Sequence, residues 1–400
     1  MPRFYRALIF VIFTIFLAAC ASQPEEIVAP TAAASDDFTF GLILVGPSTD
    51  HGWSEAHYNG GLYIEEHITN SKMLLSENLN PDARPEATLR GEVKTMIDNG
   101  AKLIFITSDD FSADTLMVAQ EYPETYFVHI SGDHALQDTG PQNLSNYMGK
   151  MIYGKMIAGC AAALASETNA IGYVGPLINS ETLRLTNASY LGAKYCFANY
   201  RDMGPEQMRF RVEWIGFWFH VPGVTADPTE VTNTLLDEGF DVILSGIDTV
   251  EPSTTTAERA AQGENLYTAP YDYEDACQNA EEICLGVPYY NWGPGYLQFA
   301  QAIKQDTWNK IWIWAEPDWA NINDPETSPI GFAPGVALTP EQQEQLDLFI
   351  AGLGNGSINL FKGPLYLQDG SIYLPAGETA SDEQIWNMPQ LLEGMEGLSE

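Results

Sequence analysis

The stretch that decides the fold is Thr39-Phe40-Gly41-Leu42-Ile43-Leu44-Val45, which is followed by Gly46-Pro47-Ser48-Thr49-Asp50-His51-Gly52-Trp53. A nearly continuous apolar run of this kind is typical of a strand that is covered on both faces. From Trp53 to Ile68 the apolar and small residues return near helical spacing. The segment therefore predicts a strand, a loop and a helix. The loop stands at the carboxyl end of the strand, where open α/β sheets bind their ligands.

The same alternation continues on the C-terminal side of this unit. After the loop at 138–143 a second series of strands and helices begins, so the sequence predicts an α/β fold with two parallel-sheet lobes. The segment from Leu360 to Leu374 differs and predicts a hairpin that turns at Asp369-Gly370. The predicted strands are 103–107, 126–130, 170–174, 211–217 and 242–245, and the predicted helices are 89–97, 146–166, 181–200 and 229–238.

The N-terminus is typical of an exported lipoprotein. Arg3 and Arg6 precede an apolar run that is too short to span a bilayer and that ends in Leu17-Ala18-Ala19-Cys20. This ending is similar to a bacterial lipobox, which predicts a signal peptide over 1–20 and lipidation of Cys20; a plain secretory signal is the alternative. Residues 21–37 predict a flexible tether. We expect a membrane-anchored protein on the periplasmic or extracellular face.

Charge and cysteines narrow the class of protein further. The chain has 18 Lys and Arg against 54 Asp and Glu, a net charge of −36, so it offers no broad basic surface and nucleic-acid binding is not expected. Outside the cytoplasm disulfides persist. Cys277 and Cys284 lie close together and are the favoured pair, whereas Cys160 and Cys196 either pair or are small buried residues.

No motif in the sequence requires catalysis, a metal ion or a cofactor. Nucleophile elbows, phosphate-binding glycine loops and dinucleotide fingerprints are missing, the six histidines are scattered, and carboxylate pairs such as Asp109-Asp110 are expected by chance at this charge. The notable feature is a set of aromatic and acidic residues in predicted loops, which suits a flat, uncharged ligand. These residues are Asp50, Trp53, Trp218, Asp272 and Trp292.

Motifs spread over most of the chain resemble the basic membrane protein family, which includes the Med and purine-nucleoside-receptor lipoproteins. The resemblance implies a substrate-binding lipoprotein of an ABC importer with a type I periplasmic-binding fold. Its motifs are 41–46, Asp50-His51-Gly52-Trp53, Gly60-Gly61, 143–159, 171–175, 187–193, 290–294, 361–365 and 375–378.

The resemblance also implies a ligand and the residues that contact it. A purine nucleoside or base would lie between Trp53 of the first lobe and Trp218 of the second, with Asp50 binding the ligand or fixing its own loop. Where the family often carries an aspartate after the second aromatic, this chain has Phe219-His220. The remaining implied contacts are Asp272 to ribose hydroxyls, the Gly246 backbone, Ser131 or Asp133 at the purine edge, and Asn291 or Trp292 near the ribose.

Two lobes imply a division of the chain and a mechanism. We expect 38–143 with about 272–335 in the first lobe, and 144–271 with about 336–400 in the second. Ligand binding would close the lobes, and an ABC permease with its ATPase would recognise the closed form. Two alternatives are a sensing or adhesion lipoprotein without a permease, and a secreted glycoside hydrolase. The hydrolase would need two acids such as Asp50 and Asp272 about 5–9.5 Å apart.

Overall fold

The computed structural model describes residues 37–400. The predicted signal peptide, Cys20 and all of the predicted tether except Asp37 lie outside these residues. Within residues 37–400, no helix combines the length and the apolar character that crossing a bilayer requires.

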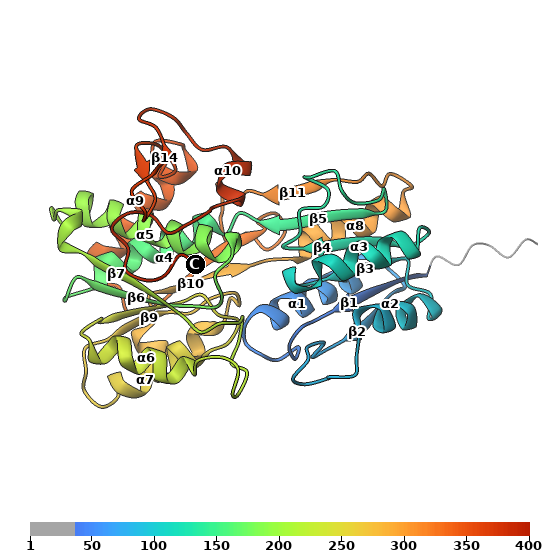
Figure 1. Ribbon diagram of the computed structural model, residues 1–400, viewed down its shortest axis with the longest axis horizontal. Helices are drawn as coiled ribbons and strands as arrows, with labels where there is room; N and C mark the ends of the chain where they lie inside the picture. Colours follow the sequence, from blue (N-terminus) through green and yellow to red (C-terminus); the bar gives the residue numbers. More distant parts are fainter. Residues whose placement is uncertain (1–36) are drawn as a thin grey trace, which may run out of the picture. The chain divides into compact units, whose positions relative to one another are not determined.

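The first lobe is built on a six-stranded parallel sheet in the order β11-β5-β4-β3-β1-β2 (Figure 1). Leu42 and Ile43 of the central strand β1 pack into different hydrophobic clusters, so both faces of the sheet are covered. This explains why the strand is apolar throughout rather than alternating. The strands are β1 (Phe38–Ile43), β2 (Ser71–Ser76), β3 (Leu103–Ile106), β4 (Tyr126–Ile130), β5 (Leu144–Gly149) and β11 (Trp312–Ala315), and the helices are α1 (Trp53–His67), α2 (Leu89–Asp98), η1 (Asp109–Phe111), α3 (Ser112–Glu121) and α8 (Gly293–Lys304).

The second lobe is built on a four-stranded parallel sheet in the order β7-β6-β8-β9. Helices α4 and α5 pack closely because Gly159 and Gly192 lie at their contact: a Cβ at either glycine would come within about 2 Å of a carbonyl oxygen of the other helix. The Cys160–Cys196 disulfide joins the same two helices. The elements are β6 (Ala170–Gly175), β7 (Arg209–Trp214), β8 (Val242–Ser245), β9 (Tyr267–Ala269), α4 (Ile152–Ala165), α5 (Ser180–Tyr200), η2 (Pro205–Gln207), α6 (Pro228–Asp237) and α7 (Glu251–Ala260).

The remaining elements are short and complete the C-terminal part of the chain. Strands β10 (Gly286–Tyr290) and β12 (Ile330–Pro334) form an antiparallel pair, and β13 (Leu365–Tyr366) with β14 (Ile372–Leu374) forms a second pair. Gly370 in the turn of this hairpin has a φ of 84°, a conformation that favours glycine. The helical elements are η3 (Ala276–Asn279), η4 (Glu281–Ile283), α9 (Pro340–Gly354) and α10 (Asp382–Trp386).

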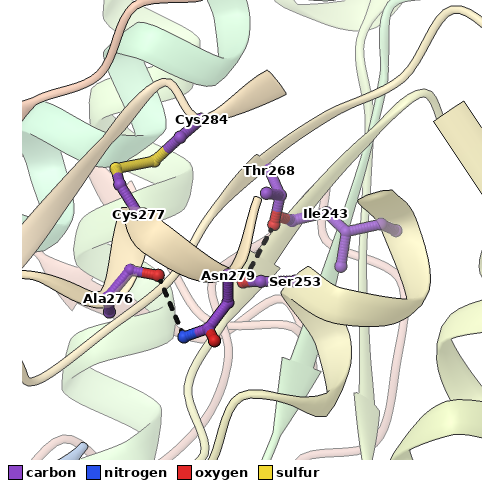
Figure 2. Close-up of a disulfide and its surroundings, with 7 residues drawn as sticks. All are labelled: Ile243, Ser253, Thr268, Ala276, Cys277, Asn279 and Cys284. Carbon is purple, nitrogen blue, oxygen red and sulfur yellow. Dashed lines mark hydrogen bonds between the residues drawn. A yellow bond between two sulfur atoms is a disulfide. The ribbon is translucent and has the colours of Figure 1, made fainter. Parts of the chain in front are cut away.

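A second disulfide, Cys277–Cys284, closes the segment between β9 and β10 (Figure 2). Beside it the Thr268 hydroxyl donates a hydrogen bond to the Ile243 carbonyl oxygen at 2.9 Å, which joins β9 to β8. The disulfide therefore shapes the connection through which the chain leaves the second sheet.

The prediction of an α/β fold with two parallel-sheet lobes is confirmed, but two element boundaries are wrong. The helix predicted from Asn146 begins at Ile152, because 144–149 is a buried strand of the first sheet whose apolar residues run directly into α4. The strand predicted over 211–217 ends at Trp214, and Gly216 beyond it has a φ of 104°. Trp218 therefore lies in a loop. The division of the chain at residues 143, 271 and 335 stays a prediction.

Candidate ligand-binding site

A nearly closed cavity of about 10 Å³ lies where the two lobes meet. The residues that line it share one property: each stands just beyond the carboxyl end of a parallel strand. Four of these residues follow strands of the first sheet, and four follow strands of the second sheet. This is the position at which open α/β sheets bind ligands. The lining residues are Trp53, Ser108, Asp109 and Ser131 from the first lobe, and Glu181, Trp218, Asp248 and Tyr271 from the second.

Trp53 has a fixed orientation at the start of α1. Its indole N–H donates to the Thr107 carbonyl oxygen at 2.8 Å. Its ring also packs edge to face against His57, Tyr290 and Trp292, at centroid distances of 4.5, 5.5 and 5.4 Å. Because the ring is already held, little conformational entropy remains to be lost when a ligand packs against it.

Trp218 connects the two lobes directly. Its indole N–H donates to Asp109 Oδ1 at 2.9 Å, and Asn179 Nδ2 donates to Asp109 Oδ2 at 3.0 Å. Both donors belong to the second lobe, whereas Asp109 begins η1 of the first lobe. The Asp248 backbone N–H also donates to the Trp218 carbonyl oxygen at 3.0 Å. The structure therefore shows the lobes in contact around the cavity.

Asp50 fixes its own loop. Its carboxylate accepts hydrogen bonds from the backbone N–H groups of Gly52, Ser54 and Glu55, at 2.9–3.0 Å. It does not line the cavity and instead borders a neighbouring hollow of about 230 Å³. Burial raises the pKa of Asp50, although these three donors act in the opposite direction.

The other candidates from the sequence occupy different places. Ser131 lines the cavity, and its hydroxyl donates to Glu181 Oε1 at 3.4 Å. Gly246 does not line the cavity, and a Cβ there would come within 2.4 Å of the Tyr173 ring. Trp292 is 1% exposed, packs among aromatic rings and borders a separate hollow of about 400 Å³.

Asp272 is fully buried beside the cavity, which its neighbour Tyr271 lines. Neither of its carboxyl oxygens has a hydrogen-bond partner, and its φ is 73°. The two acids that a glycoside hydrolase would need therefore do not face each other across the cavity: Asp50 binds backbone N–H groups, and Asp272 lies beneath the surface.

Sequence reasoning missed five lining residues: Ser108, Asp109, Glu181, Asp248 and Tyr271. The available signal was their position, because each follows a strand of a parallel sheet. Asp109 was interpreted as one member of a chance carboxylate pair, yet its two oxygens bind side chains of the opposite lobe. Asp109, Glu181 and Asp248 lie around one cavity only because the two lobes meet there.

The cavity is lined by carboxyl groups whose pKa values burial raises. Burial raises the pKa of Asp109 and raises that of Glu181 to about 7, although Arg184 lies 3.3 Å from a Glu181 carboxylate oxygen. Burial also lowers the pKa of Lys155 to about 7, despite the charge of Asp272. Within residues 37–400 no cluster of His, Cys, Asp or Glu is arranged to hold a metal ion.

Residues 38–286 match the family model described as "ABC transporter substrate-binding protein PnrA-like". The chain belongs to this family. As a PnrA-like protein it is an extracytoplasmic, non-enzymatic solute-binding component of an ABC transporter. This confirms the family that the sequence motifs resemble.

Two relatives and one solved structure illustrate the relationship. A protein named as a purine-binding protein of Brucella abortus is 27% identical over 91% of this chain and 95% of its own length. A Haloferax volcanii protein, provisionally named as an ABC transporter glucose-binding protein, is 26% identical over 89% of this chain and 79% of its own. The structure of an ABC transporter solute-binding protein from Aeropyrum pernix K1 covers 80% of this PnrA-like chain and 92% of its own. It has a TM-score of 0.62 at 12% identity, and so supports the fold alone.

Proposed function

We propose that this protein binds a purine nucleoside or purine base between its two lobes. The observation that carries the proposal is that Trp53 and Trp218, which come from different lobes, line one cavity. Flat aromatic surfaces favour a planar ring, and stacking on a protein aromatic contributes about 1–3 kcal/mol per base. The name of the Brucella relative supports the same class of ligand.

The cavity is nearly closed in this structure. Its volume of about 10 Å³ has room for about one water molecule and is far below the roughly 300–1,000 Å³ that is usual for ligand pockets, so the lobes would have to separate before a purine enters. Of the candidates named from the sequence, Trp53, Trp218 and Ser131 are the direct contacts in this proposal. Asp50 acts by fixing the first loop, and Asp272, Gly246 and Trp292 support the surrounding walls.

Binding would be coupled to closure of the lobes. A ligand that contacts both lobes stabilises the closed form by its differential affinity for that form. The hydrogen bond from Trp218 to Asp109 would then form part of the closed arrangement. In this proposal the permease and ATPase of an importer recognise the closed form, and lipidation of Cys20 holds the protein at the membrane.

The proposal predicts that Trp218→Ala weakens purine binding by about tenfold or more, because one stacking surface is lost. Calorimetric titration of residues 21–400 with adenosine, guanosine, inosine and adenine measures this, with glucose as the comparison ligand. Trp218→Phe is the matched control: it keeps an aromatic face and loses the bond to Asp109, so we expect a smaller effect. If no purine produces heat or a thermal shift, the purine proposal is wrong; if Trp218→Ala keeps full affinity, Trp218 is not a contact.

A further inference from the structure

The donors around the cavity are already engaged. The Trp53 and Trp218 N–H groups bind Thr107 and Asp109, and the Tyr271 hydroxyl donates to the Tyr290 hydroxyl at 3.4 Å. The free hydrogen-bonding capacity of the cavity is therefore concentrated in its carboxyl groups.

Asp248 differs from the other carboxyl groups in the cavity wall. It is 6% exposed, and it borders both the cavity and the neighbouring hollow next to Asp50. Its backbone N–H binds Trp218, but among residues 37–400 its carboxyl group has no hydrogen-bond partner. By contrast, Asp109 binds Trp218 and Asn179, and Glu181 binds Ser131 and Arg184. An unpartnered carboxyl group at a cavity wall is free to form a hydrogen bond with a ligand, whereas Asp109 and Glu181 would first have to give up the bonds that they already make.

The charged groups that act most strongly on Asp248 are all carboxyl groups. Burial and four carboxyl groups raise its pKa well above the usual range. The nearby cations serve other groups: Arg184 pairs with Glu181, and Lys155 donates to the Ser245 carbonyl oxygen at 2.7 Å. His220 borders the neighbouring hollow and engages Thr225. The four acids are Asp50 before α1, Asp109 in η1, Glu181 in α5 and Asp272 after β9.

Such surroundings favour the neutral form of a carboxyl group, and a neutral carboxyl group presents one O–H donor beside one C=O acceptor. We propose that Asp248 is a specificity-determining residue, which pairs as a carboxylic acid with a heterocycle edge that carries one N–H donor beside one ring-nitrogen acceptor. The inference rests on the proposed purine-binding function and deepens it. In an adenine ring, the amino group and the adjacent ring nitrogen form an edge of this kind. A sugar hydroxyl would not require the acid to be neutral.

A comparison of two ligands with three proteins tests the pairing. Adenosine and purine riboside differ at this edge only by the amino group, so we expect the wild-type protein to bind adenosine at least tenfold more tightly. Asp248→Ala should reduce that preference to less than threefold. Asp248→Asn keeps one donor and one acceptor in the same place, so it should retain the preference. Asp347→Asn, at an exposed position on α9, is the control for loss of one negative charge.

The pH dependence of binding gives a second readout. If the open site holds an ionised Asp248, each ligand bound takes up one proton, and wild-type affinity should fall by up to tenfold per pH unit as the pH rises from 6 to 8. Asp248→Asn cannot titrate and should give a flatter profile. Glu181→Gln should keep the wild-type slope, which separates Asp248 from Glu181, whose pKa burial raises to about 7.

The outcomes separate the two proposals. Wild-type protein that binds no purine overturns both. Wild-type protein that binds adenosine while Asp248→Ala keeps the full preference overturns the role of Asp248 alone. The role of Asp248 is also overturned if the Asp248→Asn variant folds, as judged by circular dichroism, but loses adenosine binding. That result would mean that the ligand requires an ionised carboxylate. If Asp248→Ala does not fold, the ligand preference and pH profile of Asp248→Asn decide the question.

Discussion

At the scale of single residues, the two tryptophans that line the cavity are held in different ways. Trp53 is bonded to Thr107 and packed against rings of its own lobe, so its position does not depend on the other lobe. Trp218 is bonded to Asp109 of the opposite lobe. Opening of the lobes would break the second contact and leave the first intact. The position of the Trp53 ring is therefore independent of closure, whereas the contact that holds the Trp218 ring depends on it.

Gly52 of the first lobe lies directly against Asp248 of the second. A Cβ at this position would lie 1.9 Å from the Asp248 carbonyl oxygen, a separation that real Cβ atoms do not reach. We therefore expect Gly52→Ala to hinder closure and to weaken ligand binding by tenfold or more, with little change in the stability of either lobe. Calorimetry and a thermal melt measure the two effects. Gly91→Ala is the control, because its Cβ would meet only the Thr88 hydroxyl, at 3.2 Å. Unchanged affinity in Gly52→Ala would contradict the contact.

At the scale of secondary structure, the short helix α10 joins parts of the fold that are distant in sequence. It lies beside β11 (Figure 1). Trp386 packs edge to face against Trp312 and Trp314 of that strand, at centroid distances of 5.1 and 5.4 Å. It also lies 4.1 Å from the guanidinium of Arg184 on α5, the residue that pairs with Glu181 at the cavity. The C-terminal helix thus contacts both a strand of the first sheet and a helix of the second lobe.

We expect Trp386→Ala to lower the free energy of unfolding by about 3–5 kcal/mol, the usual range for removing a buried large aromatic side chain. Because Arg184 also loses a partner beside Glu181, ligand affinity should fall as well. Chemical denaturation and calorimetry measure the two effects. Trp386→Phe, which keeps a ring in the same place, should recover part of both. A variant with normal affinity and lowered stability would restrict α10 to a purely structural role.

At the scale of the whole molecule, the buried acids make stability depend on pH. Asp109, Glu181, Asp248 and Asp272 have raised pKa values in the folded state, mainly because they are buried. An unfolded carboxyl group ionises near pH 4, so above that pH the unfolded state binds fewer protons than the folded state. The free energy of unfolding therefore falls as the pH rises. Exposed acids with lowered pKa values act in the opposite direction below about pH 4.5. Buried His57 and His129, whose pKa values burial lowers, also act in the opposite direction up to about pH 6.5, but they are two groups against four acids.

We expect the melting temperature to decrease from pH 5 to pH 7 at constant ionic strength, with the steepest change ending near the pKa of about 7 for Glu181. Above that pH, Lys155, whose pKa is lowered to about 7, favours the folded state as the pH rises and offsets the trend. Asp248→Asn should flatten the slope, since it removes one of the raised carboxyl groups. Calorimetric melts at several pH values measure this. A melting temperature that rises from pH 5 to pH 7 would contradict it.

The sequence by itself determined the fold class, the family and the strand, loop and helix that place Trp53 at the cavity. The run from Thr39 to Val45 and the motif ending in Trp53 are local features: burial on both faces and a loop at a strand end leave a direct pattern along the chain. The hairpin turn at Asp369-Gly370 is local in the same way. In contrast, the sequence did not predict β5 as a strand, because its apolar residues continue into α4 without a break.

The tertiary structure alone decided which acids share the cavity. Asp109, Glu181 and Asp248 are far apart in the chain, and no periodicity links them. They meet because the carboxyl ends of two parallel sheets face one cavity, and their raised pKa values come from that meeting and from burial. The same holds for Asp50 and Trp292, which seemed alike in sequence. One binds backbone N–H groups and the other lies in an aromatic core, because side-chain direction depends on packing that a single sequence does not record.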